Sequence, residues 1–398
     1  MITAEEAEKL IFQHTLTLKS EAIPYHQAHG RILNEEISAD RDFPPFDRVT
    51  MDGIAIQYSQ SKEFSITGIQ AAGSPPQKLN KQSEAIEVMT GAVLPEGADT
   101  VIPYELITIS GSTPRMAILE SMPKKGQNVH RKGSDRLKEE VIVRPGTIIG
   151  PTEIGVAATV GLTEINVLKP PKVAIISTGD ELVPIENRPL PHQIRSSNAA
   201  TIASALEKWS ITSDLFHIVD DLEGTTSKLE ELLESYEVLI LSGGVSKGKF
   251  DYVPAALEKL QVEKHFHRIK QRPGKPFWFG SHKSGPVVFA FPGNPVSVFM
   301  CFIRYLQPWL NHIFNLPNKA LQAQLQQDIT FAPDLNYLAQ VKVRIEKGAI
   351  IADPIQGRGS GDLANMVDAD GFIELPRGKD IFRKGELYTL HPYRPLNT

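Results

Sequence analysis

The residues best suited to chemistry in this 398-residue sequence are carboxylates that follow short apolar runs. Asp180 and Glu181 follow KVAIIST, the pair Asp220-Asp221 ends DLFHIVDD, and Asp251 comes shortly after EVLILSGG. Acidic side chains gathered from three strand ends would repel one another unless a cation lay between them. A hard cation such as Mg²⁺ prefers oxygen ligands. We therefore expect a magnesium-dependent site.

Glycine-rich turns and a basic segment supply groups that can bind an anion. In SGGVSKGKFD, residues 242–251, glycines allow successive backbone amides to point at an oxyanion. The rigid turn FPGNP, residues 291–295, leads into a helical pattern whose positive end can face the same anion. The segment KHFHRIKQRPGK, residues 264–275, is rich in Lys and Arg and has no acid. Together these features describe a crevice for a metal-bridged phosphate compound.

Each of these motifs also has a purely structural interpretation. Asp180 and Glu181 can cap a helix, glycine-rich loops after strands are common, and a basic run is by default a solvated surface. Asp52 in MDG and Thr90 in MTG are of turn-forming type, because Asp and Thr before glycine favour turns. No single motif decides between the two interpretations.

The composition narrows the class of protein. With 41% hydrophobic and 22% charged residues, a net charge of -5 and no basic tail, the chain is not suited to gripping nucleic acid. A single cysteine, Cys301, excludes a disulfide framework within one chain, and its apolar surroundings predict a core position. The acidic first turn of MITAEEAEKLIFQH is unlike a secretory signal, and Pro and Gly interrupt the longest apolar stretch. We expect a cytoplasmic protein that does not span a membrane.

The hydrophobic patterns predict a multidomain α/β plus β fold. Thr3 and Glu6 form a capping-box pattern before an amphipathic helix. Short β-like runs fill about residues 43–136, and β-like segments return from about residue 316. After Pro170-Pro171, buried apolar strands alternate with helical patterns, which predicts a doubly wound, mostly parallel sheet. In such a sheet ligands bind beyond the carboxyl ends of the strands, where the carboxylates above lie.

Eight segments in order resemble the signatures of the molybdopterin molybdenumtransferases, the family that includes the E domain of gephyrin. The segments are FDRVTMDGIAI, EVMTGAVLPEGAD, STGDELV, SSNAATI, DDLEGT, SGGVSKGKFDYV, IKQRPGKPFWFG and FPGNPVSVF. The resemblance implies a homodimer of four-part protomers, with the active cleft between the α/β domain of one subunit and the β module of its partner. It divides the chain into a linking domain (1–42 and 137–168), an inserted β-rich module (43–136), an α/β molybdopterin-binding domain (169–315) and a C-terminal β-barrel-like domain (316–398).

The resemblance also assigns roles to individual residues. Catalytic roles are expected for Asp52, Thr90, Glu181, Asp221, Asp251, Lys270 and Lys275. Of these, Glu181, Asp221 and Asp251 are expected to organise Mg²⁺. Substrate contacts are expected at Thr178, Gly179, Asp180, Ser242, Gly243, Gly244, Ser246, Gly248, Pro292, Gly293, Asn294, Pro295, Arg358 and Ser360. Asp135 matches a further acidic position of the family.

The activity that the resemblance implies is molybdenum insertion into adenylylated molybdopterin, with molybdate as the metal source and release of AMP. The dithiolene sulfurs belong to the substrate, which fits the absence of an apparent Ser-His-Asp set. Two alternatives are adenylylation of molybdopterin by ATP, since the α/β domain also resembles that adenylyltransferase, and a binding or scaffolding role. The extra β domains count against the first, and the retained carboxylates against the second. A transient contact with a molybdopterin adenylyltransferase remains open.

Overall fold

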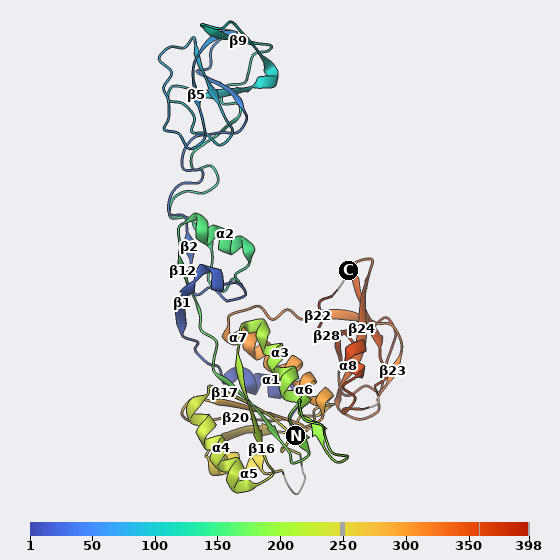
Figure 1. Ribbon diagram of the computed structural model, residues 1–398. Coiled ribbons are helices and arrows are strands. Elements are labelled where there is room, and N and C mark those ends of the chain that lie inside the picture. Colours follow the sequence, from blue (N-terminus) through green and yellow to red (C-terminus); the bar gives the residue numbers. More distant parts are fainter. Residues whose placement is uncertain (247–250, 358, 397–398) are drawn as a thin grey trace. The chain divides into compact units, whose positions relative to one another are not determined.

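The computed structural model describes residues 1–246, 251–357 and 359–396, and the chain forms two compact units (Figure 1). The β unit comprises Ile23–His29 and Glu35–Ile165. The α/β unit comprises Met1–Ala22, Gly30–Asn34 and Asn166–Thr398. Strands β1 (Ser20–Pro24) and β12 (Glu164–Leu168) contain residues at which the chain passes from one unit to the other.

The β unit contains a six-stranded sheet with the strand order β7-β4-β6-β5-β9-β8. Its strands are β4 (Gly53–Ile56), β5 (Glu63–Gln70), β6 (Glu84–Val88), β7 (Thr100–Pro103), β8 (Ile107–Ser110) and β9 (Arg115–Leu119). Side chains alternate across a strand, so Ile54 and Ile56 join one apolar cluster while Ala55 joins another. Gly53 is needed here because a Cβ atom would lie 1.9 Å from the carbonyl oxygen of Ile102.

Short elements complete the β unit. They are η1 (Tyr25–Gln27), β2 (Ile37–Ser38) paired with β11 (Val141–Val143), β3 (Arg48–Val49) paired with β10 (Val129–His130), η2 (Tyr104–Leu106) and α2 (Pro151–Thr159). The sequence-based prediction of a β-rich module is confirmed. The exact divisions between the four predicted domains stay a prediction.

The α/β unit is built on a six-stranded sheet with the order β16-β13-β17-β21-β20-β18. Its strands are β13 (Val173–Thr178), β16 (Ser213–Ile218), β17 (Val238–Ser242), β18 (Glu263–His267), β20 (Trp278–Ser281) and β21 (Val287–Phe291). The first four strands in this order run parallel, β20 pairs antiparallel with β21, and β18 pairs antiparallel with β20. Every residue of β13, β17 and β21 is buried, as expected for strands covered on both faces.

Helices cover both faces of this sheet because alternate strand residues point to opposite sides (Figure 1). The helical segments are α1 (Ala4–Gln13), α3 (Ser197–Leu206), η3 (Glu207–Trp209), α4 (Leu222–Ser235), α5 (Val253–Lys259), α6 (Pro295–Cys301), η4 (Phe302–Leu306) and α7 (Gln307–Ile313). Ile175 and Ile240 pack in one cluster with α1, α3, α6 and α7. Ile176 and Leu241 pack in the other with α4 and α5. The prediction of a doubly wound sheet is confirmed.

The first helix carries the predicted capping box. The Thr3 hydroxyl accepts a hydrogen bond from the Glu6 amide at 3.2 Å, and the Glu6 carboxylate accepts one from the Thr3 amide at 2.8 Å. Ala7 and Ile11 are fully buried in the cluster that also contains α7. The amphipathic face of α1 is therefore docked on the α/β core.

The C-terminal part of the α/β unit is a closed five-stranded barrel. Its strands are β22 (Leu321–Leu325), β24 (Asn336–Glu346), β25 (Ala349–Pro354), β26 (Gly371–Leu375) and β28 (Leu387–Pro392), and β24 pairs with both β25 and β26 to close the ring. Further elements are β19 (Gln271–Arg272), which pairs with β24, then β14 (Leu182–Val183), β15 (Ile194–Arg195), β23 (Ile329–Thr330), β27 (Ile381–Phe382) and α8 (Asn365–Asp368). The predicted barrel-like terminal domain is confirmed. In the described part of the chain, no helix has the length and apolar character that crossing a membrane requires.

Candidate active site

A cavity of about 560 Å³ lies at the carboxyl ends of β13, β17 and β21, and we call it the carboxylate cavity. It is lined by the loops that follow these strands and β16, by residues 182 and 194–195 including Arg195, by the N-terminal residues of α3 and by Gly361 of the terminal part. Its acidic members are Glu181, Asp220 and Asp251. The predicted gathering of strand-end carboxylates is therefore present in the structure.

Asp180, Glu181 and Asp251 concentrate negative charge around Asp220, and Arg195 is the cation among the described residues that line the carboxylate cavity. Burial raises the pKa of the Asp220 carboxyl above its usual range, and the nearby charges of Asp180, Glu181 and Asp251 raise it further. A hydrogen bond from the Asp220 amide to the Asp180 carboxylate at 3.1 Å fixes this pair of loops. The cavity therefore favours a cation, or a protonated group, beside Asp220.

Asp221 has a different position from its neighbour. It is the N-cap of α4, and its carboxylate accepts a hydrogen bond from the Gly224 amide at 2.6 Å. Its side chain is exposed and does not line the carboxylate cavity. The sequence analysis gave Asp221 the catalytic and metal-binding role, whereas the structure brings Asp220 to the cavity.

The floor of the carboxylate cavity is formed by backbone that glycine makes possible. Gly243 and Gly244 have φ angles of +99° and +68°, and a Cβ atom on either would lie within 2.9 Å of the Thr178 hydroxyl. That hydroxyl is buried and has no hydrogen-bond partner among the described residues. Asn198 of α3 ties two loops together, because its amide donates to Ser242 Oγ at 2.8 Å and to the Gly293 carbonyl at 2.7 Å. Asn198 was not among the predicted site residues.

A second cavity, of about 870 Å³, opens between the α/β sheet and the barrel, and we call it the basic cavity. Arg272 and Lys275 line it, together with the hydroxyl groups of Ser246, Ser297 and Ser360. No acidic side chain occurs among its described lining residues. Its barrel side carries an apolar wall in which the rings of two residues stack with centroids 4.4 Å apart, namely Phe331 and Tyr337.

The two cavities adjoin. Ser246, Gly293 and Asn294 line both. At this junction the Asn294 amide donates to Ser360 Oγ at 2.7 Å, and the Ser360 carbonyl accepts from the Val296 amide at 3.0 Å. The predicted PGNP turn and the predicted Ser360 thus meet, although 65 residues of sequence separate Pro295 from Ser360.

The other predicted residues divide into three groups. Thr178, Gly179, Ser242, Gly243, Gly244, Ser246, Pro292, Gly293, Asn294, Pro295, Lys275 and Ser360 line one cavity or the other. Lys270 lines neither, and Arg272, from the same basic segment, stands in the basic cavity. Gly248 and Arg358 lie outside the described residues.

Asp52 and Thr90 form a pair of their own in the β unit. The amide and the hydroxyl of Thr90 donate to the same Asp52 carboxylate oxygen, at 2.6 Å and 2.8 Å. These bonds, the one from the amide foremost, hold the pKa of Asp52 below its usual range. Asp135, also in the β unit, contacts His130 Nε2 at 2.8 Å. Both Asp52 and Thr90 are exposed, so an anionic oxygen is presented on the surface of the module.

The carboxylates suit a metal that is shared with a ligand. Among residues 1–246, 251–357 and 359–396, no three carboxylate, imidazole or thiol groups are gathered closely enough to hold a metal ion by themselves. Mg²⁺, however, is usually held by one or two carboxylates together with substrate phosphates and water. The raised pKa of Asp220, which lies near three other acidic side chains, fits that kind of binding. The donor set therefore fits a cation that arrives with a phosphate compound.

Models of three domain families match consecutive parts of the chain. The MoeA N-terminal region (domains I and II) matches residues 2–161, a probable molybdopterin-binding domain matches residues 174–312, and the MoeA C-terminal region (domain IV) matches residues 322–393.

Proteins with similar sequences and structures match nearly the whole chain. A molybdopterin molybdenumtransferase from Synechocystis is 36% identical over 99% of this chain and 100% of its own length. One from Staphylococcus epidermidis is 29% identical over 97% of this chain and 94% of its own. Two structures of a molybdopterin biosynthesis MoeA protein from Pyrococcus horikoshii align with TM-scores of 0.85 and 0.82, at 29% and 28% identity, over 99% of this chain and 99% and 100% of theirs.

Proposed function

This chain belongs to the molybdopterin molybdenumtransferase family, and we propose that it inserts molybdenum from molybdate into adenylylated molybdopterin, with release of AMP. Relatives that match almost the full length, including the β module and the barrel, bear the molybdenumtransferase name. This favours the transferase over the alternative of an adenylyltransferase, which resembles only the α/β domain.

The observation that carries the proposal is the pair of adjoining cavities with opposite charge. The carboxylate cavity contains Glu181, Asp220 and Asp251, and the basic cavity contains Arg272 and Lys275. The reaction brings together a phosphoanhydride, which takes a divalent cation, and molybdate, which is a bare oxyanion. We assign the first to the carboxylate cavity and the second to the basic cavity, so the reacting groups meet at the shared lining.

Mg²⁺ is the proposed cofactor, and one or two of the carboxylates of Glu181, Asp220 and Asp251 would hold it together with substrate phosphates and water. When bound, it would neutralise phosphate charge and polarise the phosphoanhydride. Asp221 is replaced by Asp220 in this assignment, because the Asp221 carboxylate is engaged as the cap of α4. In the Gly243-Gly244 loop the Gly243 amide donates to the Phe291 carbonyl at 3.1 Å, so the Gly244 amide is the one that would face the phosphate oxygens.

Molybdate is proposed to bind between Arg272, Lys275 and the serine hydroxyls of the basic cavity. Charge-assisted hydrogen bonds of this kind are shorter and stronger than neutral ones, and Arg recognises tetrahedral oxyanions with a planar fork of donors. Since the lining contains no described carboxylate, nothing there repels the anion. Lys270, which lines neither cavity, has no assigned contact with molybdate.

The nucleophiles in this reaction are the dithiolene sulfurs of the substrate. The two sulfurs bond to molybdenum, and one oxo ligand leaves as water after taking up the two thiol protons. The only cysteine, Cys301, is fully buried, and burial raises the pKa of its thiol, so it is not a protein nucleophile.

The remaining expectations belong to the same proposal. They are homodimerisation, a functional role for Asp52 and Thr90 of the module, and transient contact with a molybdopterin adenylyltransferase in the cytoplasm. The last follows from the substrate, because an adenylyl-transfer reaction must supply it. No step of the chemistry above depends on how the β unit is placed.

The test is AMP release from adenylylated molybdopterin with Mg²⁺, with and without molybdate. Wild type is compared with Asp220→Asn and with Asp221→Asn, which removes a carboxylate from the next position in the chain. We expect molybdate-dependent release that Asp220→Asn reduces by about tenfold or more, and more strongly than Asp221→Asn, because only Asp220 lines the carboxylate cavity in which the cation would bind. Release that does not depend on molybdate contradicts the proposal.

A further inference from the structure

Buried hydrogen bonds hold the loop of residues 271–275, which carries both cations of the basic cavity. Gln271 is 0% exposed, and its side-chain amide donates to the Gly274 carbonyl at 3.0 Å. Its side-chain oxygen accepts a hydrogen bond from the Tyr305 hydroxyl. Arg272 and Lys275 lie between and beside these anchor points, with exposed side chains in the cavity.

We propose that Tyr305 is a positioning residue for oxyanion binding, acting through Gln271 on the loop that presents Arg272 and Lys275. This inference rests on the proposed function, since it takes the basic cavity as the molybdate site. Tyr305 is 1% exposed and lines neither cavity, so it does not touch the substrate itself. Its effect is on the direction of the two cationic side chains.

The inner side of this loop is closely packed. Gly274 has a φ angle of +80°, and a Cβ atom there would lie 2.5 Å from Met300 Cε and 2.7 Å from Cys301 Sγ. The inner face of the loop is therefore in close contact with α6. Burial raises the pKa of the Tyr305 phenol well above its usual value, so the group stays a neutral donor to Gln271 at any working pH.

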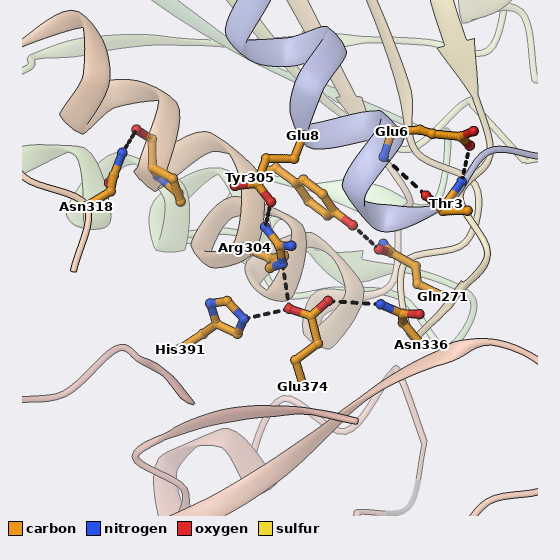
Figure 2. Close-up of polar contacts among 11 residues, drawn as sticks. Thr3, Glu6, Glu8, Gln271, Arg304, Tyr305, Asn318, Asn336, Glu374 and His391 are labelled. Atoms are coloured by element: carbon orange, nitrogen blue, oxygen red, sulfur yellow. Dashed lines mark hydrogen bonds and ion pairs between the residues drawn. The ribbon is translucent and has the colours of Figure 1, made fainter. Parts of the chain in front are cut away.

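Tyr305 is itself fixed, because the neighbouring Arg304 is held in a buried network (Figure 2). Arg304 bonds to Glu374 of β26 at 2.7 Å and to Glu8 of α1 at 2.8 Å. Both residues belong to η4, a single π-helical turn, and such turns occur often at functional sites. Tyr305 and Arg304 thus point from one turn toward two different partners.

The same turn is also connected to the barrel strand that lies beside this loop. Glu374 accepts a hydrogen bond from the Asn336 side chain at 3.0 Å, and Asn336 begins β24 (Figure 2). In the pairing of β19 with β24, Gln271 is opposite Asn336 and Arg272 is opposite Tyr337. The turn η4 is therefore connected by hydrogen bonds both to the loop and to the barrel strand. Because both line the basic cavity, a buried tyrosine in this turn can affect oxyanion binding.

The experiment measures binding of inorganic molybdate to the full chain by titration calorimetry, for wild type, Tyr305→Phe, Lys275→Ala and Tyr393→Phe. Tyr393 is a matched control, because its hydroxyl also makes one internal hydrogen bond in the α/β unit, to the Met366 carbonyl at 2.9 Å. We expect Tyr305→Phe to weaken molybdate binding about tenfold, the lower end of what outer partners of a binding group typically contribute. Tyr393→Phe should bind as wild type does. Hydrogen exchange over residues 268–277 should accelerate only in Tyr305→Phe.

A double variant, Tyr305→Phe with Gln271→Leu, separates positioning from stability. Replacing both partners of a buried hydrogen bond by apolar groups can be nearly neutral for folding, whereas removing one leaves the other unsatisfied. Gln271→Leu also leaves the Gly274 carbonyl without its amide donor, so we expect the double variant to unfold at a lower urea concentration than wild type. Measured without urea, where both proteins are folded, it should still bind molybdate about tenfold more weakly than wild type does.

The outcomes are distinguishable. If Lys275→Ala weakens molybdate binding while Tyr305→Phe and the double variant bind as wild type does, the role of Tyr305 is refuted and the proposed function stands. If molybdate binds wild type and Lys275→Ala equally, or binds neither, the assignment of the basic cavity fails and the role of Tyr305 fails with it.

Discussion

Removing the charge of Glu374 should destabilise the α/β unit by a predictable, pH-dependent amount. The side chain is 11% exposed and lies between Arg304 and His391, with bonds of 2.7 Å and 2.8 Å (Figure 2). Burial by itself would raise the pKa of this carboxyl. The hydrogen bond from His391 and the charge of Arg304 outweigh burial and lower the pKa from 4.5 to about 2.

The magnitude follows from linkage between protonation and folding. A pKa that falls from 4.5 to about 2, at about 1.4 kcal/mol per pH unit, corresponds to a contribution on the order of 3 kcal/mol. Because the folded-state pKa is depressed, this contribution is fully present above pH 4.5 and is lost as the pH falls toward 2. About 2 kcal/mol of it should be lost by pH 3. Breaking one side of a buried ion pair gives a similar figure, about 3–5 kcal/mol.

The assay is urea unfolding of wild type and Glu374→Gln between pH 6 and pH 3, followed by tryptophan fluorescence. All three tryptophans, Trp209, Trp278 and Trp309, belong to the α/β unit, so the signal reports that unit alone. We expect Glu374→Gln to lower the free energy of unfolding by about 3 kcal/mol at pH 6 and by much less at pH 3. Glu346→Gln, which removes an exposed carboxylate of the same barrel, is the control. A difference between wild type and Glu374→Gln that does not change with pH would refute the reasoning.

Three further predictions concern the two cavities. Arg272→Ala should weaken molybdate binding by at least tenfold in calorimetry, and more than Lys270→Ala does, because only Arg272 lines the basic cavity; equal effects would contradict this. Asp221→Ala should lower the free energy of unfolding by about 1 kcal/mol, the typical value for loss of an N-cap, and an unchanged urea midpoint would contradict it. Gly243→Ala should lower the thermal unfolding temperature, because the added Cβ would lie 2.7 Å from the Thr178 hydroxyl at a φ of +99°; wild-type stability would show that the loop relaxes freely.

Much of the fold follows from hydrophobic pattern. The runs VAIIST, VLILS and VVFAF are continuous apolar stretches, and they form β13, β17 and β21, which are buried on both faces. The Thr3–Glu6 capping box is equally local, and it begins α1 as expected. The closure of the barrel by pairing of β24 with β26 is a long-range event that no local pattern specifies.

The sequence predicted which loops form the candidate site, but not always which side chain of a loop enters the cavity. Adjacent carboxylates in sequence point in different directions, because the residue that begins a helix is drawn to the free amides of its first turn; Asp221 caps α4 and leaves Asp220 to the cavity. Along β19, Gln271 is buried and Arg272 exposed, but strand alternation puts Lys270 on the same side as Arg272 and does not choose between these two cations. For Asp221, the N-cap position before Gly224 was the signal available in the sequence.

Asn198 and Tyr305 show what a single sequence does not contain. Asn198 connects Ser242 with Gly293, which lie 44 and 95 residues away along the chain. In the sequence, Tyr305 is one of several large residues in an apolar helical pattern. Its proposed positioning role depends on Gln271, 34 residues earlier. Partners of this kind become visible only when the tertiary structure brings separate loops together.

In the proposed function, molybdenum becomes bonded to the substrate's sulfurs as AMP leaves. The most direct measurement is X-ray absorption at the molybdenum edge after the protein has been incubated with adenylylated molybdopterin, molybdate and Mg²⁺, with AMP quantified in the same sample. We expect molybdenum–sulfur bonds to appear in proportion to AMP in wild type. Lys275→Ala and Asp220→Asn should form far fewer of them. Release of AMP while molybdenum keeps only oxygen neighbours would contradict the proposed function.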